Sequence, residues 1–394
     1  MPGPLTGVRI VDCTNMISGP MATMILGDQG ADVLKIEAPG TGDLVRHMGS
    51  GRRGMAPTFA TVNRNKRSVV LNLREPRGLE LLERLVSGAD VFVQNFRPGT
   101  AERMGIGEEV LRRVQPDLVY VSISGFGETG PYAKKRVYDP IVQALSGLAS
   151  IQADRTTGRP HMLRLIVPDK LTALTAAQAI TAALFARART GTGQHVRLSM
   201  LDATVSFLWH EAMAGYTWVG DETERARPQL AQDLVFKTTD GFMTAGTVAD
   251  AEWQGFCRAA NRPEWRDDPR FATTGARVLH VEERLARMQE VLAGATTDEW
   301  LERLDAEGVP CAPILSRSEL LSHPQLAANE LVVEGTHPHA GPMRQPRHAA
   351  RFDATPAELR LPAPLLGEHT DEVLAELGLD AEQVTTLRRD GILD

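Results

Sequence analysis

Asp169 is the residue whose type and setting best fit covalent chemistry. It follows Pro168 and an apolar stretch, residues 163–167, that we expect to be a strand, and it precedes an alanine-rich segment, residues 170–189, that we expect to be a helix. The start of a helix offers unpaired N–H groups and the positive end of the helix dipole. These groups would keep a carboxylate ionised, and hence nucleophilic. The alternative is an ordinary helix cap, for which aspartate is a favoured residue.

The first third of the chain holds further candidates, at the end of a predicted strand over residues 90–95. Asn95 and Phe96 would lie at the carboxyl end of that strand, where open α/β sheets bind ligands. Gly99 would let the backbone approach a ligand closely. Phe96 can equally be a core residue. Residues 1–140 carry a net charge of +3 and the remainder −10, which is compatible with a bound anion in the first part or with a solvated charged surface.

Alternating strands and helices would position these residues. One predicted helix begins at Pro20 and ends at Gly30, which follows the preference for proline at the start and glycine just past the end. The predicted strands cover residues 7–12, 31–37, 68–73, 90–95 and 117–124, and further helices cover 76–87 and 107–114. Repeated strand–helix–strand units with buried strands indicate a Rossmann-like, doubly wound parallel sheet of the α/β class.

The rest of the chain predicts a second, smaller domain and a return to the first. A strand at 194–201 and a helix to about 214 precede a polar linker at 220–232; then come a hairpin turning at 240–241, mostly helical residues 250–307, a strand at 309–316 and a helical pair at 370–377 and 381–389. We expect the strand at 309–316 to return to the α/β pattern. The expected layout is a large domain at 1–220, a small α+β domain at 225–320 and a return to the large domain at 321–394.

Several ligand classes are disfavoured. The first strand-to-helix turn has the single Gly19 where a dinucleotide fingerprint needs three glycines, and no phosphate-binding P-loop occurs, so NAD, FAD and ATP are not expected. Cys13, Cys257 and Cys311 are odd in number and far apart, which argues against disulfides and zinc knuckles. The Glu368–His369 pair lacks metal-ligand spacing, and we expect no metal site.

The sequence also predicts a cytoplasmic protein without nucleic-acid or membrane partners. The net charge of −7 argues against general affinity for nucleic acid. No run approaches the ~20 apolar residues of a membrane-spanning helix. The N-terminal residues lack the layout of a signal peptide.

Seven phrases resemble, in order and spacing, the CaiB/BaiF family, the class III CoA-transferases, whose members include formyl-CoA and carnitine CoA-transferases. They are GVRIVDCTNMISGP (7–20), GADVLKIEAPGTGD (30–43), NRNKRSVVLNL (63–73), QNFRPGTAERMGI (94–106), VYDPIVQALSGL (137–148), TGTGQHVRLSMLDA (190–203) and PLLGEHTDEVL (364–374). The resemblance implies an interlocked homodimer, with CoA along the large domain, that moves CoA from an acyl-CoA donor to a free carboxylic acid.

The resemblance also implies that Asp169 is the nucleophile. Asp169 would attack the donor thioester to give a mixed anhydride, and the CoA thiolate would then form an aspartyl–CoA thioester that the acceptor acid resolves. Neither ATP nor a metal is needed, because one thioester is exchanged for another. The protein must exclude water from both intermediates.

The CoA cradle implied by the resemblance needs cations for the phosphates of CoA, and arginine suits phosphate because its planar guanidinium can donate two hydrogen bonds. Arg103 and Arg136 match basic CoA contacts of the family, whereas Arg74 stands where some members have a lysine. Each arginine could instead be an ordinary surface residue. The expected CoA-contacting residues are Ile17, Leu71, Arg74, Asn95, Phe96, Arg97, Arg103 and Arg136.

The family also contains 2-methylacyl-CoA racemases, which is the alternative function. Those enzymes need two acid–base groups, and one of them is a histidine at the position that here is Tyr138. The ordinary pKa of tyrosine, near ~10, makes it a poor base at neutral pH. The substitution favours a transferase, in which Tyr138 would shape the acyl pocket.

Two departures from the family pattern bear on the substrate. Formyl- and oxalate-specific members carry a glutamine where this chain has Ile17, and they carry a glycine-rich lid in the small domain. The nearest stretch here is ARPQLAQD (226–233), which has no glycine. A larger or less polar acyl group is therefore expected than oxalate. A third hypothesis is a CoA-binding protein without catalysis.

Overall fold

The computed structural model describes residues 3–154, 157–220 and 233–394. These residues form two compact units. The first unit contains residues up to His210 and from Glu330 onward, and the second unit is Glu211–Asn329. Residues 221–232, which make up nearly all of the predicted linker and most of the stretch at 226–233, lie outside the described residues.

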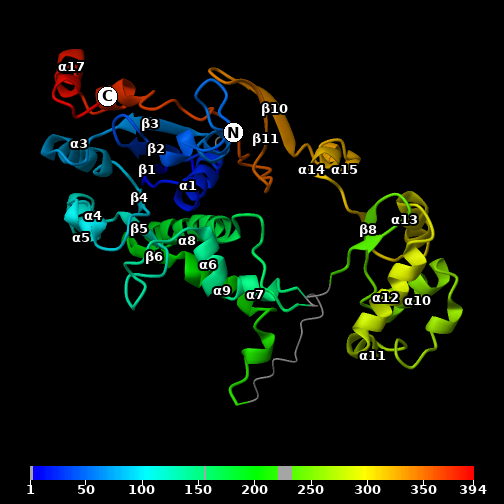
Figure 1. Ribbon diagram of the computed structural model, residues 1–394. Coiled ribbons are helices and arrows are strands. Elements are labelled where there is room, and N and C mark those ends of the chain that lie inside the picture. The colour runs from blue at the N-terminus through cyan, green and yellow to red at the C-terminus, as the bar shows by residue number, and fades with distance from the viewer. Residues whose placement is uncertain (1–2, 155–156, 221–232) are drawn as a thin grey trace. The chain divides into compact units, whose positions relative to one another are not determined.

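A six-stranded sheet forms the centre of the first unit (Figure 1). Its strands are β1 (Arg9–Cys13), β2 (Asp32–Glu37), β3 (Lys66–Val70), β4 (Val91–Gln94), β5 (Val119–Ser124) and β6 (His195–Ser199). All neighbours pair in parallel, in the order β3-β2-β1-β4-β5-β6. The chain runs outward on one side of β1 and then returns to its other side, so the topological switch point lies between β1 and β4. The predicted doubly wound α/β fold is confirmed.

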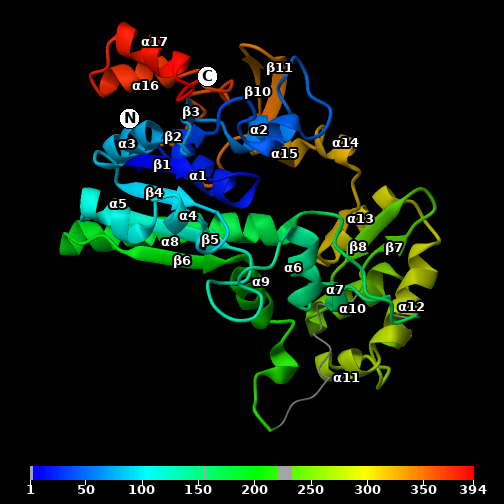
Figure 2. The same ribbon diagram turned by 60° about the vertical axis from the view of Figure 1, so that its left-hand side comes forward.

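Helices cover both faces of this sheet (Figure 2). Apolar residues of α1 (Ser18–Asp28) and α8 (Val167–Thr190) pack on one face. Those of α3 (Pro76–Val86), α5 (Glu108–Val114), α16 (Thr370–Glu376) and α17 (Ala381–Arg389) pack on the other. The remaining helices of the first unit are α2 (Pro57–Val62), α4 (Thr100–Arg103), α6 (Asp139–Leu145), α7 (Leu148–Ile151), α9 (Met200–Trp209) and a 3₁₀ turn at Leu44–His47.

The long helix α8 is shaped by its alanines. Buried Ala173, Ala176 and Ala177 let it lie close to its neighbours, and it packs against α1, α6 and α9 and against β5 and β6. It ends at Gly191, whose left-handed backbone (φ 71°) closes the last turn. Contrary to the sequence-based expectation, α8 is long and apolar enough to cross a membrane by length and composition alone.

Two predicted strands are wrong as placed. Residues 163–166 are not a strand, because the side chain of Gln143 bonds the N–H of Leu163 and faces the carbonyls of Leu163 and Leu165. The predicted strand at 309–316 is shortened to β9 (Cys311–Pro313), which pairs antiparallel with β8 in the second unit rather than joining the parallel sheet. Its prolines leave too few N–H donors for a central strand.

The second unit is a small α+β body with its own core. Its three-stranded antiparallel sheet is β7 (Phe236–Lys237), β8 (Phe242–Ala245) and β9. Its helices are α10 (Asp250–Ala259), α11 (Thr274–Leu279), α12 (Val281–Leu292), α13 (Thr297–Ala306), α14 (Arg317–Leu320) and α15 (Pro324–Ala328), with 3₁₀ turns at Ala214–Tyr216 and Pro263–Trp265. Buried Trp253, Phe256 and Phe271 centre the core. The first unit resumes with the hairpin of β10 (Val332–His337) and β11 (Gly341–Pro346).

Candidate active site

Asp169 lies in the first turn of α8 but does not cap it. The helix begins at Val167, and the cap position is Ile166, which offers no side-chain acceptor. The backbone N–H of Asp169 instead donates to Oδ2 of Asp139 at 3.2 Å. The alternative of an ordinary helix cap is therefore wrong, because another aspartate accepts this N–H. The Asp169 side chain is half-buried and makes no ion pair with any residue that the structure describes.

The electrostatic setting of Asp169 differs from the one expected at a helix start. Burial raises the pKa of Asp169 to about 6, and the charge of Asp139 adds to the rise, whereas a hydrogen bond from the backbone of Ser18 opposes it. Burial and a like charge outweigh the helix N-terminus here. The carboxylate is still mainly ionised at pH 7, by roughly ten to one. A raised pKa also makes an ionised carboxylate a stronger nucleophile than an ordinary aspartate.

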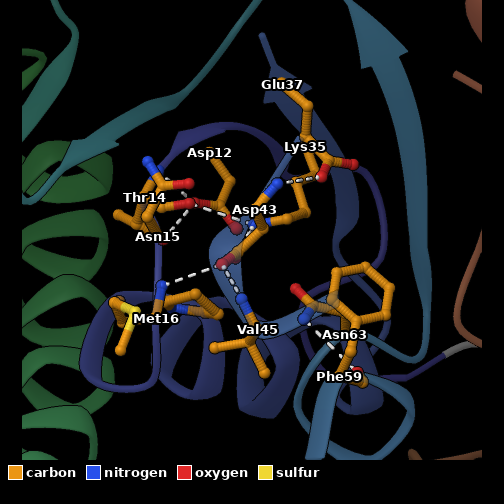
Figure 3. Close-up of polar contacts among 12 residues, drawn as sticks. Asp12, Thr14, Asn15, Met16, Lys35, Glu37, Asp43, Val45, Phe59 and Asn63 are labelled. Carbon is orange, nitrogen blue, oxygen red and sulfur yellow. Dashed lines mark hydrogen bonds and ion pairs between the residues drawn. The ribbon is translucent and has the colours of Figure 1, made fainter. Parts of the chain in front are cut away.

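Ser18 begins α1 and follows a tight loop, residues 14–17, at the carboxyl end of β1. Met16 in this loop has φ 70°, a left-handed conformation that a residue with a side chain rarely adopts. Its N–H donates to Asp43 at 3.1 Å, and so does that of Val45 at 3.1 Å (Figure 3). Asp43 therefore holds the turn that places the Ser18 N–H at Asp169.

Two buried lysines, Lys35 and Lys66, bond residues in and next to this loop. Lys35 is completely buried and donates to Asp43 at 2.9 Å and to the carbonyl of Thr14 at 3.0 Å. Burial opposes its charge, but Asp43 and Asp12 beside it raise the pKa of Lys35. Lys66 is equally buried, and burial lowers its pKa to about 8 although it contacts Asp12 at 2.9 Å. Burial also opposes the charge of Asp12, but the two lysines hold its pKa well below the usual range.

Asn95 ties the loop after β4 to the loop after β1. Its Oδ1 accepts the N–H of Asn15 at 2.9 Å, and its Nδ2 donates to the carbonyl of Asn15 at 2.7 Å. These bonds bridge the topological switch point, where open α/β sheets bind ligands. Both polar atoms of the Asn95 amide therefore bond the backbone of Asn15. In this structure Asn95 positions the loop after β1.

A cleft of about 510 Å³ opens beside the carboxyl ends of β4 and β5, and His195 and Arg197 of β6 also line it. Phe96 and Arg97 line it together, as does Gly99 with φ 80°. The remaining lining residues are Gln94, Pro98, Ala101, Glu102, Gly107, Glu108, Glu109, Val110, Ser122, Ile123, Ser124, Glu128, His195 and Arg197. The structure therefore brings two of the predicted CoA contacts into one cleft.

A hydrogen-bonded chain across the strand ends fixes Phe96 beside this cleft. The Phe96 N–H donates to Gln94 Oε1 at 2.8 Å, Gln94 Nε2 donates to Ser122 Oγ at 3.1 Å, and that hydroxyl lies 2.7 Å from His195 Nε2. Burial and the neighbouring Arg197 lower the pKa of His195. Sequence inspection assigned no role to Gln94 or Ser122, because their partners are on other strands.

The other predicted residues are more widely spread. Arg74, after β3, and Arg136, before α6, are exposed, and Arg103 at the end of α4 bonds Thr100 at 2.9 Å. Tyr138 is 64% exposed and immediately precedes Asp139. Leu71 is buried in the sheet core, and its N–H is bonded to the carbonyl of Glu37.

Ile17 is buried in an apolar cluster with Val45 and Phe59, against which Ile166 packs. The structure thus joins Ile17 and Asp169 through this cluster and the Ser18 backbone. Leu71 belongs to a different buried cluster, on the other face of the sheet, and the backbone N–H of Arg74 bonds Asn72.

Residues that could hold a metal ion are not clustered in the described part of the chain. No group of three or more histidine, cysteine, aspartate or glutamate side chains has a suitable arrangement there. Cys13 and Cys257 are buried and Cys311 is half-buried, and none is in a disulfide.

Comparisons with known proteins agree with the fold and with the predicted family. The model of CoA-transferase family III matches residues 5–370. An acyl-CoA transferase of Fusarium pseudograminearum is 37% identical over 99% of this chain and 88% of its own length. A succinyl-CoA:glutarate CoA-transferase of Mus musculus is 36% identical over 99% of this chain and 90% of its own length.

A solved structure of a CaiB/BaiF family protein from Brucella suis has a TM-score of 0.81 and is 32% identical, covering 96% of this chain and 100% of that one. The family model's match over residues 5–370 includes all the residues from which the site is built. The family and the transferase class, predicted from the seven phrases, are confirmed, and so is the doubly wound fold, predicted from the alternation of strands and helices. This chain belongs to CoA-transferase family III, the CaiB/BaiF class, whose enzymes act on CoA thioesters.

Proposed function

We propose that this CoA-transferase works through covalent intermediates on Asp169. The observation that carries the proposal is the condition of the Asp169 carboxylate. It is half-buried, it makes no ion pair with any described residue, and its contacts are the Ser18 backbone and the charge of Asp139. A partly desolvated carboxylate without a counter-ion keeps its lone pairs available for attack on a carbonyl carbon.

The first half of the reaction places the donor acyl group on Asp169. An oxygen of the carboxylate attacks the thioester carbonyl, a C–O bond forms, and the C–S bond breaks. The products are a mixed anhydride and the CoA thiolate, so the negative charge moves from Asp169 to sulfur. The partly buried setting limits access of water, which would otherwise hydrolyse the anhydride.

The second half places CoA on Asp169. The thiolate attacks the aspartyl carbonyl of the anhydride, the donor acid leaves as its carboxylate, and an aspartyl–CoA thioester remains. The oxyanion on the aspartyl carbonyl needs a donor, and we assign this role to the Ser18 N–H, since the Ser18 backbone lowers the pKa of this side chain. The N–H of Asp169 is engaged with Asp139. The acceptor carboxylate then reverses both steps.

CoA would be bound by the first part of the chain. Arg74, Arg97 and Arg136 are exposed and have no carboxylate within ion-pair distance among the residues that the structure describes, so their charges are available to phosphates. Phe96 and Arg97, in the cleft, would contact one end of CoA. Ile17, Leu71, Asn95 and Arg103 complete the proposed cradle, with Asn95 positioning the loop at the switch point.

For the substrate we propose a dicarboxylic acid thioester of the succinyl-CoA type. The support is the name of the mouse relative. Ile17 and its apolar cluster near Asp169 agree with an acyl chain longer than formyl or oxalyl. Tyr138, which precedes Asp139 and is largely exposed, would border the acyl group.

We propose that two copies form a homodimer, interlocked as the family resemblance implies. Leu174 and Phe185 on α8 are 54% and 65% exposed, and they lie three turns apart on the same side of that helix. On the neighbouring helix α9, Phe207 is 60% exposed. A stripe of large exposed apolar residues is typical of a surface that another protein covers.

We also propose a cytoplasmic location, with small molecules and a second copy as the partners. The support is the state of the three cysteines, none of which is in a disulfide. A reducing compartment keeps thiols in this state.

The decisive experiment traps the intermediates. The protein is incubated with succinyl-CoA and then with hydroxylamine or borohydride, and the peptide containing residue 169 is analysed by mass spectrometry. We expect modification at Asp169 and none in Asp169→Asn. Asp202→Asn is the matched control, since Asp202 is also the third residue of a helix but is exposed. If CoA transfer proceeds without a trapped adduct at residue 169, the proposed nucleophile is wrong.

The two alternatives have their own signatures. A racemase would wash solvent deuterium into the α-position of a 2-methylacyl-CoA, and a binding protein would bind CoA without exchanging labelled CoA between acids. We expect exchange of labelled CoA and no deuterium incorporation. Deuterium incorporation without exchange would favour the racemase.

A further inference from the structure

Asp139 contacts the proposed nucleophile from a separate helix. It is the first residue of α6 and only 3% exposed. Its Oδ2 accepts the N–H of Asp169 at 3.2 Å, and its Oδ1 accepts Nε2 of Gln143 at 2.6 Å. In the sequence, Asp139 belongs to the segment that corresponds to the His–Asp pair of the racemases, but no role was predicted for it.

Gln143 extends the same contact to the chain that leads into α8. Its Oε1 accepts the N–H of Leu163 at 2.9 Å, and its Nε2 lies 3.2 Å from the carbonyl of Leu165. Ile166 cannot cap α8 with its side chain. The N–H groups at a helix start need acceptors. The pair Asp139–Gln143 therefore determines where α8 begins, and with it where Asp169 lies.

The negative charge of Asp139 has a second consequence for the proposed reaction. The groups that affect the Asp169 carboxylate are Asp139 from α6 and the backbone of Ser18 from α1, and the next residue on α8, Lys170, makes no ion pair with it. Before reaction, two neighbouring carboxylates repel each other. Acylation of Asp169 removes its charge, which leaves with the CoA sulfur, so the repulsion is relieved as the covalent bond forms.

We propose that Asp139 is a positioning residue for Asp169: it fixes the start of α8 through the Asp169 N–H, and its charge favours the acylated over the free nucleophile. The proposal rests on the proposed function of Asp169. Asp139 does not touch the reacting atoms. The direction of the Asp169 pKa, raised to about 6 with Asp139 as the second cause after burial, agrees with this arrangement.

The test is the pH dependence of acylation in a single turnover with succinyl-CoA. In the unaltered protein we expect the rate to rise with pH through a limb near the pKa of Asp169, about 6. Asp139→Asn should move this limb down by about one pH unit, because the like charge is gone. It should also slow acylation above the limb by about tenfold, since one pKa unit corresponds to a tenfold difference. Asp139→Glu keeps the charge and should keep the limb.

Controls separate position from charge. The double replacement Asp139→Asn with Gln143→Glu keeps an amide–carboxylate pair but places the negative charge on residue 143, farther from Asp169. Its limb should lie at the lowered pH expected for Asp139→Asn alone. Asp380→Asn is the control at another helix start, where the Asp380 carboxylate accepts the backbone N–H of Gln383 in α17. This helix is remote from the site, so the replacement should change the stability of the protein but not the limb. A limb in Asp139→Asn that coincides with the unaltered one overturns the proposal.

Two outcomes distinguish this inference from the proposed function. If hydroxylamine traps no adduct at residue 169 in the unaltered protein, the proposed nucleophile fails first. If the adduct forms but the acid limb lies at the same pH in Asp139→Asn and in the unaltered protein, only the positioning role fails. Should Asp139→Asn not fold, the double replacement Asp139→Asn with Gln143→Glu takes its place, and a limb that coincides with the unaltered one then overturns the proposal.

Discussion

At the scale of single residues, the proposed nucleophile is governed by two opposing influences. Burial and the carboxylate of Asp139 disfavour the charge of Asp169, whereas the Ser18 N–H favours it. The net result is a carboxylate that is ionised at neutral pH but poorly stabilised. A site that holds a reactive group in this way lowers the stability of the folded protein, because the same charge would be better solvated in the unfolded chain.

This cost is measurable as a pH-dependent effect of Asp169→Asn. The pKa of Asp169 is about 6 in the folded protein and ordinarily 3.8, so the folded state binds more protons between these values and loses stability as the pH rises through them. At pH 7.5 the variant should be more stable than the unaltered protein by on the order of 2 kcal/mol. Near pH 4 the two should be alike. Urea unfolding at both values of pH checks this, and a constant difference would contradict it.

At the scale of elements, the loop between β1 and α1 is held by buried charges rather than by its own sequence. Asp43 accepts two backbone N–H groups and contacts Lys35, and both side chains are completely inaccessible. A buried pair contributes little net stability compared with apolar residues of the same size, but removing one partner leaves a buried charge alone. The pair is thus better understood as a device that fixes the Met16 turn.

Asp43→Asn tests this interpretation. We expect a loss of about 3 kcal/mol in the free energy of unfolding, because Lys35 would lose its closest carboxylate. We also expect slower acylation of Asp169, because the turn that carries the Ser18 N–H is released. The double variant Lys35→Met with Asp43→Leu should regain stability but not the acylation rate. Recovery of both would mean that the pair has no positioning role.

Gly19 tests the packing of the same loop. A Cβ atom at residue 19 would lie 2.4 Å from Cβ of Thr14, so an alanine must displace the loop or the helix. Gly19→Ala should destabilise the protein by about 1–3 kcal/mol, as overpacking does. Gly275→Ala in α11 is the control, because nothing lies within 4 Å of the added atom. Thermal unfolding of the two variants should therefore differ, and equal midpoints would contradict the prediction.

At the scale of the whole molecule, each of the two units has its own core, and the proposed catalytic groups described above lie in the first. The exposed apolar residues of α8 lie in that unit too. A helix this apolar is usually covered by its neighbours on several sides. Among the described residues of one chain, the neighbouring elements cover the alanine-rich side of α8. The second copy in the proposed dimer would cover the side of α8 that carries Leu174 and Phe185.

Sedimentation tests the dimer directly. The unaltered protein should sediment as a dimer, and Phe185→Asp should shift it towards the monomer by introducing a charge into the contact. Leu279→Asp, at an 83% exposed apolar residue of the second unit, is the matched control and should leave the mass unchanged. The proposed surface would be contradicted if the unaltered protein were monomeric, or if Phe185→Asp dimerised to the same extent as the unaltered protein.

The sequence by itself determined the parallel sheet, most of its helices and the family. Apolar runs of strand length, Pro20 and Gly30 at the ends of α1 and Gly191 at the end of α8 are local signals, and each acts within a few residues. Asp169 and the strand-end residues Asn95 and Phe96 could be named because ordered phrases accompany them. Residues 309–316 were misplaced, because a short proline-containing strand carries no information about which sheet it joins.

Only the tertiary structure decided what surrounds these residues. Asp139 is 30 positions from Asp169, and Asp43 is 27 positions from Met16, yet each contact sets the geometry of the site. The pKa of Asp169 is raised rather than held low, since burial and a like charge depend on elements that meet only in the fold. Local sequence therefore determines where a helix or strand forms, whereas the protonation and orientation of a side chain depend on distant partners brought near by packing.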